Sequence, residues 1–199
     1  MHTVYTMGID IGSTTSKCVV MKDGEQIISR AIIPFGTGTS GPDRAIGTAL
    51  DVSDLKKEDM AYILATGYGR NTTKLADTEM SELTCHARGA YLLFPAVRTV
   101  IDIGGQDIKV LRVLEGGILD NFVMNEKCAA GTGRFIEVMA RVLEVDINDM
   151  AHLSARSTER VDISSTCTVF AESEVISQLA QNKNTCDIIN GIHRSIAVR

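Results

Sequence analysis

A short signature centred on an aspartate occurs twice in this chain of 199 residues. The first copy, GIDIGSTTSK, runs from Gly8 to Lys17, and the second, VIDIGGQDIK, runs from Val100 to Lys109. In each copy an apolar stretch ends in Asp-x-Gly, and small or polar residues then lead into a second apolar stretch. Glycine lets backbone N–H groups approach an anion closely, and a nearby carboxylate can hold Mg²⁺. The repeat predicts two hairpins that bind the phosphates of one nucleotide from both sides.

The residues expected to contact the nucleotide lie within these two signatures. Asp10 and Asp102 are the candidate catalytic residues, because such a carboxylate can bind Mg²⁺ through water or orient the water that attacks a phosphate. Either aspartate on its own could instead be a strand-end residue that caps a turn. Gln106 is a third candidate, since a neutral amide can position water or phosphate without adding charge. The expected phosphate contacts are Gly12, Ser13, Thr14, Thr15, Ser16 and Lys17 in the first copy and Gly104, Gly105 and Gln106 in the second.

Hydrophobic periodicity and turn residues predict alternating strands and helices along the rest of the chain. Pro42 suits the first turn of a helix, and Pro95 is expected to end another. The predicted strands are 5–11, 17–21, 26–33 and 61–66, with the hairpin pattern repeated from residue 99. The predicted helices are 42–50, 79–94, 133–145 and 146–153, one that starts after residue 167, and one over 188–198.

The duplicated hairpin resembles that of acetate kinase, the sugar kinases, Hsc70 and actin. The resemblance implies an α/β fold of two ribonuclease-H-like lobes, the ASKHA fold, in which each lobe presents one hairpin to ATP. We expect residues 1–97 to form the first lobe and residues 98–199 the second. In that superfamily the second lobe continues into a glycine-rich loop that packs on the adenosine, and nothing after Asp187 supplies it. The second lobe is therefore expected to be incomplete at its C-terminus.

Two cysteine-containing segments carry a more specific resemblance. The segments NEKCAAGTGRF, from Asn125 to Phe135, and SSTCTVFAESE, from Ser164 to Glu174, resemble the activator component of 2-hydroxyacyl-CoA dehydratases, which are BadF/BadG/BcrA/BcrD-type ATPases. The resemblance extends along the whole chain. It implies a homodimeric, ATP-hydrolysing iron–sulfur protein of anaerobic amino acid fermentation. A reduced ferredoxin or flavodoxin would supply its electron, and a 2-hydroxyacyl-CoA dehydratase would receive that electron at low potential.

The same resemblance makes Cys128 and Cys167 the ligands of a [4Fe–4S] cluster. Each precedes a predicted helix, and the N-terminus of a helix favours a thiolate and any anionic assembly that it holds. One chain offers two such cysteines, so four ligands require two chains, with the cluster on the two-fold axis of a homodimer. No Cys-x-x-Cys pair occurs, so the assignment depends on the resemblance and on local context. Cys18 alternates into an apolar strand and is expected in the core.

Composition narrows the possible partners. The chain is 44% hydrophobic, carries a formal net charge of -5 and has a sequence pI near 5.4. Nucleic acids and anionic membranes attract basic surfaces, so neither is expected as the main partner. No apolar run reaches the roughly 18 residues of a membrane span, and the N-terminus lacks the pattern of a secretory signal. The odd number of cysteines, five, fits a reducing compartment, and we expect a cytoplasmic protein.

Three other functions are compatible with parts of this pattern. The chain could be a small-molecule kinase of the same superfamily with structural cysteines, although no acid-lined acceptor site is evident. It could be the ATPase subunit of a benzoyl-CoA reductase, since close relatives of the activators serve those enzymes. It could also be a non-enzymatic module that lacks adenosine contacts. For the activator, as for the first two of these alternatives, we expect ATP, ADP and Mg²⁺ as ligands.

Overall fold

The computed structural model describes residues 3–125, 131–163 and 167–198. The chain divides into two compact units, one made of Met1–Val100 and Leu111–Asn121 and the other of Ile101–Val110 and Phe122–Arg199. The expected lobes 1–97 and 98–199 stay a prediction, because the second hairpin contributes residues to both units. Within the described ranges, no helix has the length and apolar composition needed to cross a bilayer.

The first unit contains a five-stranded mixed sheet. Its strands are β1 (Tyr5–Ile11), β2 (Ser16–Lys22), β3 (Gln26–Ile33), β4 (Met60–Thr66) and β5 (Thr78–Glu79), in the order β3-β2-β1-β4-β5. β1 pairs antiparallel with β2 and parallel with β4. The prediction of three successive strands followed by a helix is therefore confirmed, as is the α/β fold class.

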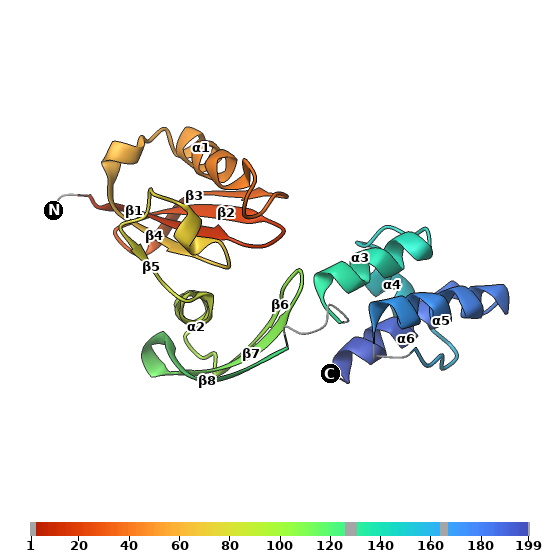
Figure 1. The fold of residues 1–199 in the computed structure, drawn as a ribbon. Helices are drawn as coiled ribbons and strands as arrows, with labels where there is room; N and C mark the ends of the chain where they lie inside the picture. Colours follow the sequence, from red (N-terminus) through yellow and green to blue (C-terminus); the bar gives the residue numbers. More distant parts are fainter. Residues whose placement is uncertain (1–2, 126–130, 164–166, 199) are drawn as a thin grey trace. The chain divides into compact units, whose positions relative to one another are not determined.

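Helix α1 (Gly41–Ser53) connects β3 to β4 and packs on the sheet (Figure 1). Alternate residues of β1 point into this core, where Ile9 and Ile11 are fully buried, and α1 contributes Ala45 and Ala49. Pro42 lies in the first turn of α1, as expected, where its missing N–H costs no helical hydrogen bond. The core fixes β1, and with it the position at which β1 ends.

Helix α2 (Glu82–Leu93) begins three residues later than the predicted start at residue 79. Thr78 and Glu79 pair with β4 as the short strand β5, so tertiary pairing overrides their helical pattern. The side chain of Ser81 accepts a hydrogen bond from the Leu83 amide and caps the helix. A second, three-stranded sheet follows in the order β6-β7-β8, with β6 at Thr99–Ile103, β7 at Ile108–Leu114 and β8 at Ile118–Asn125. Three short 3-10 helices lie in the connections between elements within the described residues: η1 (Lys57–Asp59), η2 (Arg70–Thr72) and η3 (Glu115–Gly117).

The helices of the second unit are α3 (Gly133–Val142), α4 (Met150–Ser154), α5 (Thr168–Ala180) and α6 (Thr185–Ala197). They share one apolar core in which Phe135 of α3, Val175 of α5 and Ile189 of α6 are almost completely buried. Helix α3 ends before the predicted residue 145, because Glu144 adopts a left-handed backbone conformation with φ of 54°.

The first turn of α6 is tied to the loop that precedes the second cysteine segment. Asp187 is buried, and its Oδ1 accepts hydrogen bonds from the amides of Glu159 and Thr158 and from the Ser157 hydroxyl. The amides of Glu159 and Thr158 are the main reason that the pKa of this carboxyl lies below its ordinary value. An ionised Asp187 therefore joins α6 to residues 157–159.

Candidate functional site

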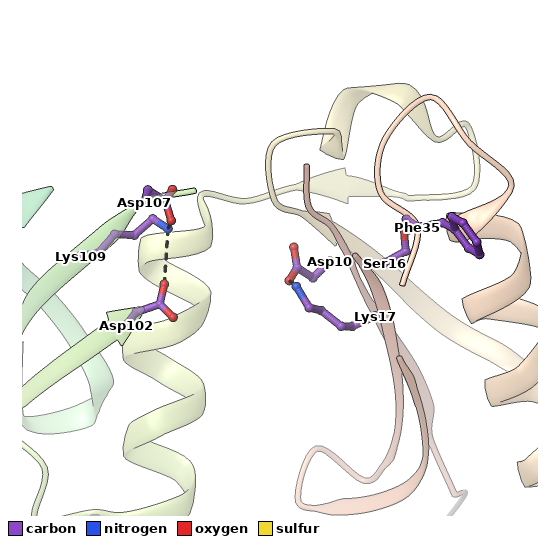
Figure 2. Close-up of polar contacts among 7 residues, drawn as sticks. All are labelled: Asp10, Ser16, Lys17, Phe35, Asp102, Asp107 and Lys109. Carbon is purple, nitrogen blue, oxygen red and sulfur yellow. Dashed lines mark hydrogen bonds and ion pairs between the residues drawn. The ribbon is translucent and has the colours of Figure 1, made fainter. Parts of the chain in front are cut away.

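The first hairpin joins β1 to β2 and places Asp10 opposite Lys17 in the strand register. The side chains of Lys17 and Asp10 point toward each other (Figure 2), with Lys17 Nζ 2.9 Å from Asp10 Oδ2. The two side chains are 42% and 27% exposed, respectively. The turn closes with a hydrogen bond of 2.9 Å from the Gly12 amide to the Thr15 carbonyl oxygen. Ser13 and Thr14 at its tip are exposed. The hairpin therefore presents an oriented carboxylate beside an accessible turn.

The second hairpin joins β6 to β7 and repeats this arrangement. Lys109 Nζ lies 3.3 Å from Asp102 Oδ2 and 2.8 Å from Asp107 Oδ1 (Figure 2). The Gly104 amide donates to the Asp107 carbonyl oxygen at 2.9 Å, and Gln106 at the tip is exposed. The difference between the copies is burial, since the Lys109 side chain is only 4% exposed and lies between two carboxylates.

The two hairpins share two contacts at equivalent positions. In each, an aspartate pairs with a lysine seven residues later, and a glycine two residues after the aspartate closes the turn. The accessible tip can approach phosphate oxygens with backbone N–H groups, and the carboxylate can take up Mg²⁺ or a water. The duplicated sequence signature therefore corresponds to a duplicated set of contacts, one set in each hairpin.

The loop before α1 supports the first turn. The Thr37 amide donates to the Gly12 carbonyl oxygen at 2.9 Å, and a Cβ at Gly36 would lie 2.3 Å from the Ser13 carbonyl oxygen. Ser16 is completely buried, and its hydroxyl donates to the Phe35 carbonyl oxygen at 2.8 Å. This contact favours a role for Ser16 in shaping the turn, and its predicted contact with nucleotide stays a prediction.

The N-terminus of α3 supports the second turn. The amides of Gly133 and Arg134 donate to the carbonyl oxygens of Gly104 and Gly105 at 2.9 and 3.1 Å. Because the first amides of a helix have no partner within the helix, these bonds satisfy two of them while fixing the turn. The helix that follows the Cys128 segment is therefore attached directly to the second candidate phosphate turn.

Of the two predicted cluster cysteines, only Cys167 lies within the described residues. Cys128 falls in residues 126–130, outside the described residues. Cys167 is the N-cap residue of α5, is partly exposed and makes no capping hydrogen bond with its side chain. Its thiol is thus placed at the N-terminus of α5. Across the described ranges, no group of three or more His, Cys, Asp or Glu side chains could hold a metal ion.

Cys18 behaves as the sequence predicts. It is buried in the core of the first unit, and this burial raises the pKa of its thiol to about 12. A thiol with so high a pKa stays protonated near neutral pH and cannot act as a thiolate ligand without a large free-energy cost. Cys18 therefore serves as the matched control for any experiment on the candidate cluster cysteines.

Two residues of the second hairpin were missed by the sequence reasoning. Lys109 and Asp107 were given no role, yet with Asp102 they form the most buried charge cluster of the hairpin. A signal was present, because Lys109 occupies the same position relative to Asp102 as Lys17 does to Asp10. Comparison of the two copies residue by residue would have found it.

Comparisons of sequence and of structure with known proteins point to the same family. Residues 7–199 match the BadF/BadG/BcrA/BcrD ATPase family. The (R)-2-hydroxyglutaryl-CoA dehydratase activating ATPase of Acidaminococcus fermentans is 61% identical over 197 residues, which span 98% of this chain and 75% of that protein. The crystal structure of the A. fermentans (R)-2-hydroxyglutaryl-CoA dehydratase component A matches with a TM-score of 0.93 at 61% identity, covering 98% of this chain and 76% of that one.

A second solved structure contains a nucleotide analogue. The activator of the 2-hydroxyisocaproyl-CoA dehydratase from Clostridium difficile, with bound ADPNP, matches with a TM-score of 0.93 and 53% identity. The match covers 98% of this chain and 73% of that one. The fold described above is therefore shared with a protein that binds an ATP analogue.

The difference in burial between the two lysines predicts a difference in stability. Replacing Lys109 with Met leaves Asp102 and Asp107 close together without their buried counter-charge, which should lower the free energy of unfolding by roughly 3 kcal/mol. Lys17→Met removes a partly exposed ion pair and should cost less than about 1 kcal/mol. Urea unfolding of both variants measures the difference, and equal losses would mean that the buried cluster is not a structural anchor.

Proposed function

Because the chain belongs to the BadF/BadG/BcrA/BcrD ATPase family, we propose that it is the ATP-hydrolysing activator of a 2-hydroxyacyl-CoA dehydratase. The observation that carries the proposal is the matched pair of hairpins, each with an aspartate, a paired lysine and a glycine-closed turn. The identity of 61% to an activating ATPase, over nearly the whole chain, supports the choice of partner class.

In this proposal the two hairpins bind the phosphates of ATP. The tip residues, Ser13 and Thr14 in one turn and Gln106 in the other, contact phosphate oxygens. Asp10 and Asp102 hold Mg²⁺ or orient the attacking water, and Lys17 and Lys109 keep their carboxylates in fixed orientations through the ion pairs described above. Phosphoryl transfer depends mainly on positioning and electrostatics, so a preset turn with a preset carboxylate suits it.

The attachment of α3 to the second turn supports coupling between nucleotide and cluster. A phosphate that binds the amides of residues 105–107 would shift the turn, and the bonds from Gly133 and Arg134 would carry the shift to the N-terminus of α3. Cys128 lies five residues before the start of that helix in the sequence. Nucleotide state could thus change the surroundings of Cys128 through two hydrogen bonds.

Cys128 and Cys167 are the residues proposed to hold a [4Fe–4S] cluster together with the same residues of a second chain. The partly exposed Cys167 at the N-cap of α5 fits a thiolate ligand. When bound, such a cluster supplies a one-electron carrier of low potential. The helix N-terminus stabilises the negative charge of the ligand thiolate, and two chains contribute two cysteines each.

The proposed partners follow from the same reading. The protein would act as a homodimer in the cytoplasm, receive its electron from a reduced ferredoxin or flavodoxin, and pass it to the dehydratase. The formal net charge of -5 gives no electrostatic support for nucleic acid as a partner. The odd number of cysteines, five, is consistent with a reducing compartment.

The nucleotide assignment is tested by removing each carboxylate charge. Asp10→Asn and Asp102→Asn should each lower ATP turnover by more than tenfold, which corresponds to about 1.4 kcal/mol of transition-state stabilisation. The effect is measured as the steady-state rate of phosphate release by each purified variant, compared with the unsubstituted protein. Iron content is the control and should not change. Turnover that survives both substitutions would reduce the hairpins to structural turns.

The cluster assignment is tested by cysteine replacement under anaerobic conditions. Cys128→Ser and Cys167→Ser should each abolish iron binding and weaken dimerisation, because every cluster would lose two of its four ligands. Cys18→Ser should leave iron content unchanged, since its buried thiol stays protonated. Iron content and sedimentation give the readouts. One complete cluster per monomer in the unmodified protein contradicts the shared site.

A further inference from the structure

The turn that follows β4 packs against the end of β1, next to Asp10. Asp10 and Thr66 are paired in the parallel register of β1 and β4, so the chain leaves both strands at the same edge of the sheet. The Gly69 amide donates to the Ile11 carbonyl oxygen at 2.7 Å, which ties the turn to β1. Of these residues, only Asp10 was assigned a role in the nucleotide site proposed above.

Gly67 makes the closest approach in this turn. It is buried, with φ of +87°, and a Cβ at this position would lie 2.3 Å from Asp10 Oδ1 and 2.6 Å from the Ile11 carbonyl oxygen. Both distances are far below the contact distance of carbon and oxygen, so a methyl group must displace the carboxylate or the backbone of β1. The backbone of Gly67 therefore lies directly against Oδ1 of Asp10, while Lys17 Nζ lies 2.9 Å from Oδ2.

Other contacts hold the turn that contains Gly67 in place. The Gly67 carbonyl oxygen accepts hydrogen bonds from the Arg70 amide at 3.3 Å and from the Arg70 guanidinium at 3.1 Å. The Thr66 hydroxyl donates to the Met80 carbonyl oxygen at 2.8 Å, which anchors the start of the turn to the residue after β5. Gly69 packs on Ile11 and Thr37 so closely that a Cβ there would lie 2.6 Å from each side chain. The turn has little room to retreat from Asp10.

We propose that Gly67 is a positioning residue that holds the Asp10 carboxylate in its reactive orientation. The proposal rests on the proposed function, because it assigns Gly67 a role only through Asp10. Lys17 pairs with Oδ2 and the Gly67 backbone lies against Oδ1, so both oxygens of the carboxylate have a neighbour that restricts their movement. Displacement of a catalytic group by about 1 Å can lower a rate by orders of magnitude.

The test compares two glycine-to-alanine substitutions that share backbone strain but differ in their neighbours. Gly67→Ala adds a methyl group against Asp10, whereas Gly24 has a similar φ of +73° with nothing within 4 Å of its Cβ position. Gly67→Ala should lower kcat for ATP hydrolysis by roughly tenfold or more, with KM for ATP changed less than about threefold. Gly24→Ala should leave both within about twofold. Thermal unfolding verifies that both variants are folded at the assay temperature.

A second comparison asks whether Gly67 acts through Asp10. In an Asp10→Asn background, adding Gly67→Ala should change kcat by less than about twofold, because the group that Gly67 positions is already lost. An equal tenfold loss in both backgrounds would overturn the proposal, and so would a kcat for Gly67→Ala equal to that of Gly24→Ala. Normal turnover of Asp10→Asn itself would overturn the proposed nucleotide role of Asp10, which is a separate failure.

Discussion

An aspartate at the end of one strand and a lysine on the next strand meet in both hairpins, and the candidate site depends on this contact. A free carboxylate beside a phosphate turn would rotate among several orientations, and like charge would weaken phosphate binding. In both hairpins the lysine orients the aspartate carboxylate. In the first it also compensates the charge of that carboxylate, whereas Lys109 shares its one positive charge between Asp102 and Asp107. The pair also explains why the turns can be glycine-rich without being loose, because each turn is closed by the Gly12 or Gly104 amide between the two paired residues.

The two copies differ in what surrounds this contact. In the first, Lys17 is partly exposed, and the turn is supported by the loop before α1 and by the Gly67 turn. In the second, Lys109 is buried between two carboxylates, and the turn is supported by the N-terminus of α3. The first copy is thus built around one carboxylate, and the second is attached directly to the N-terminus of a helix. This difference is what the proposed coupling between ATP hydrolysis and the Cys128 segment would require.

Much of this arrangement could be predicted from the sequence, because the Asp-x-Gly signature is local. The three opening strands, α1 after Pro42, and the repeated hairpin all follow from short-range patterns. The remainder depends on contacts between distant residues: β5 is two residues long and exists only because β4 pairs with it. The approach of Gly67 to Asp10 depends on strand register and on a positive φ, neither of which the sequence displays. The assignment of Cys128 remains a prediction from its context, since residues 126–130 lie outside the described structure.

The central claim is that both turns bind the phosphates of the same nucleotide, and hydrogen–deuterium exchange tests it most directly. Exchange would be followed in peptides that cover residues 12–15 and 104–107, with and without saturating ADPNP and Mg²⁺. Turn amides that donate to phosphate oxygens should exchange at least about tenfold more slowly in both segments, while the turns at Asp23–Gly24 and Gly116–Gly117 stay unchanged. Protection of one turn alone, or of neither, would contradict the account.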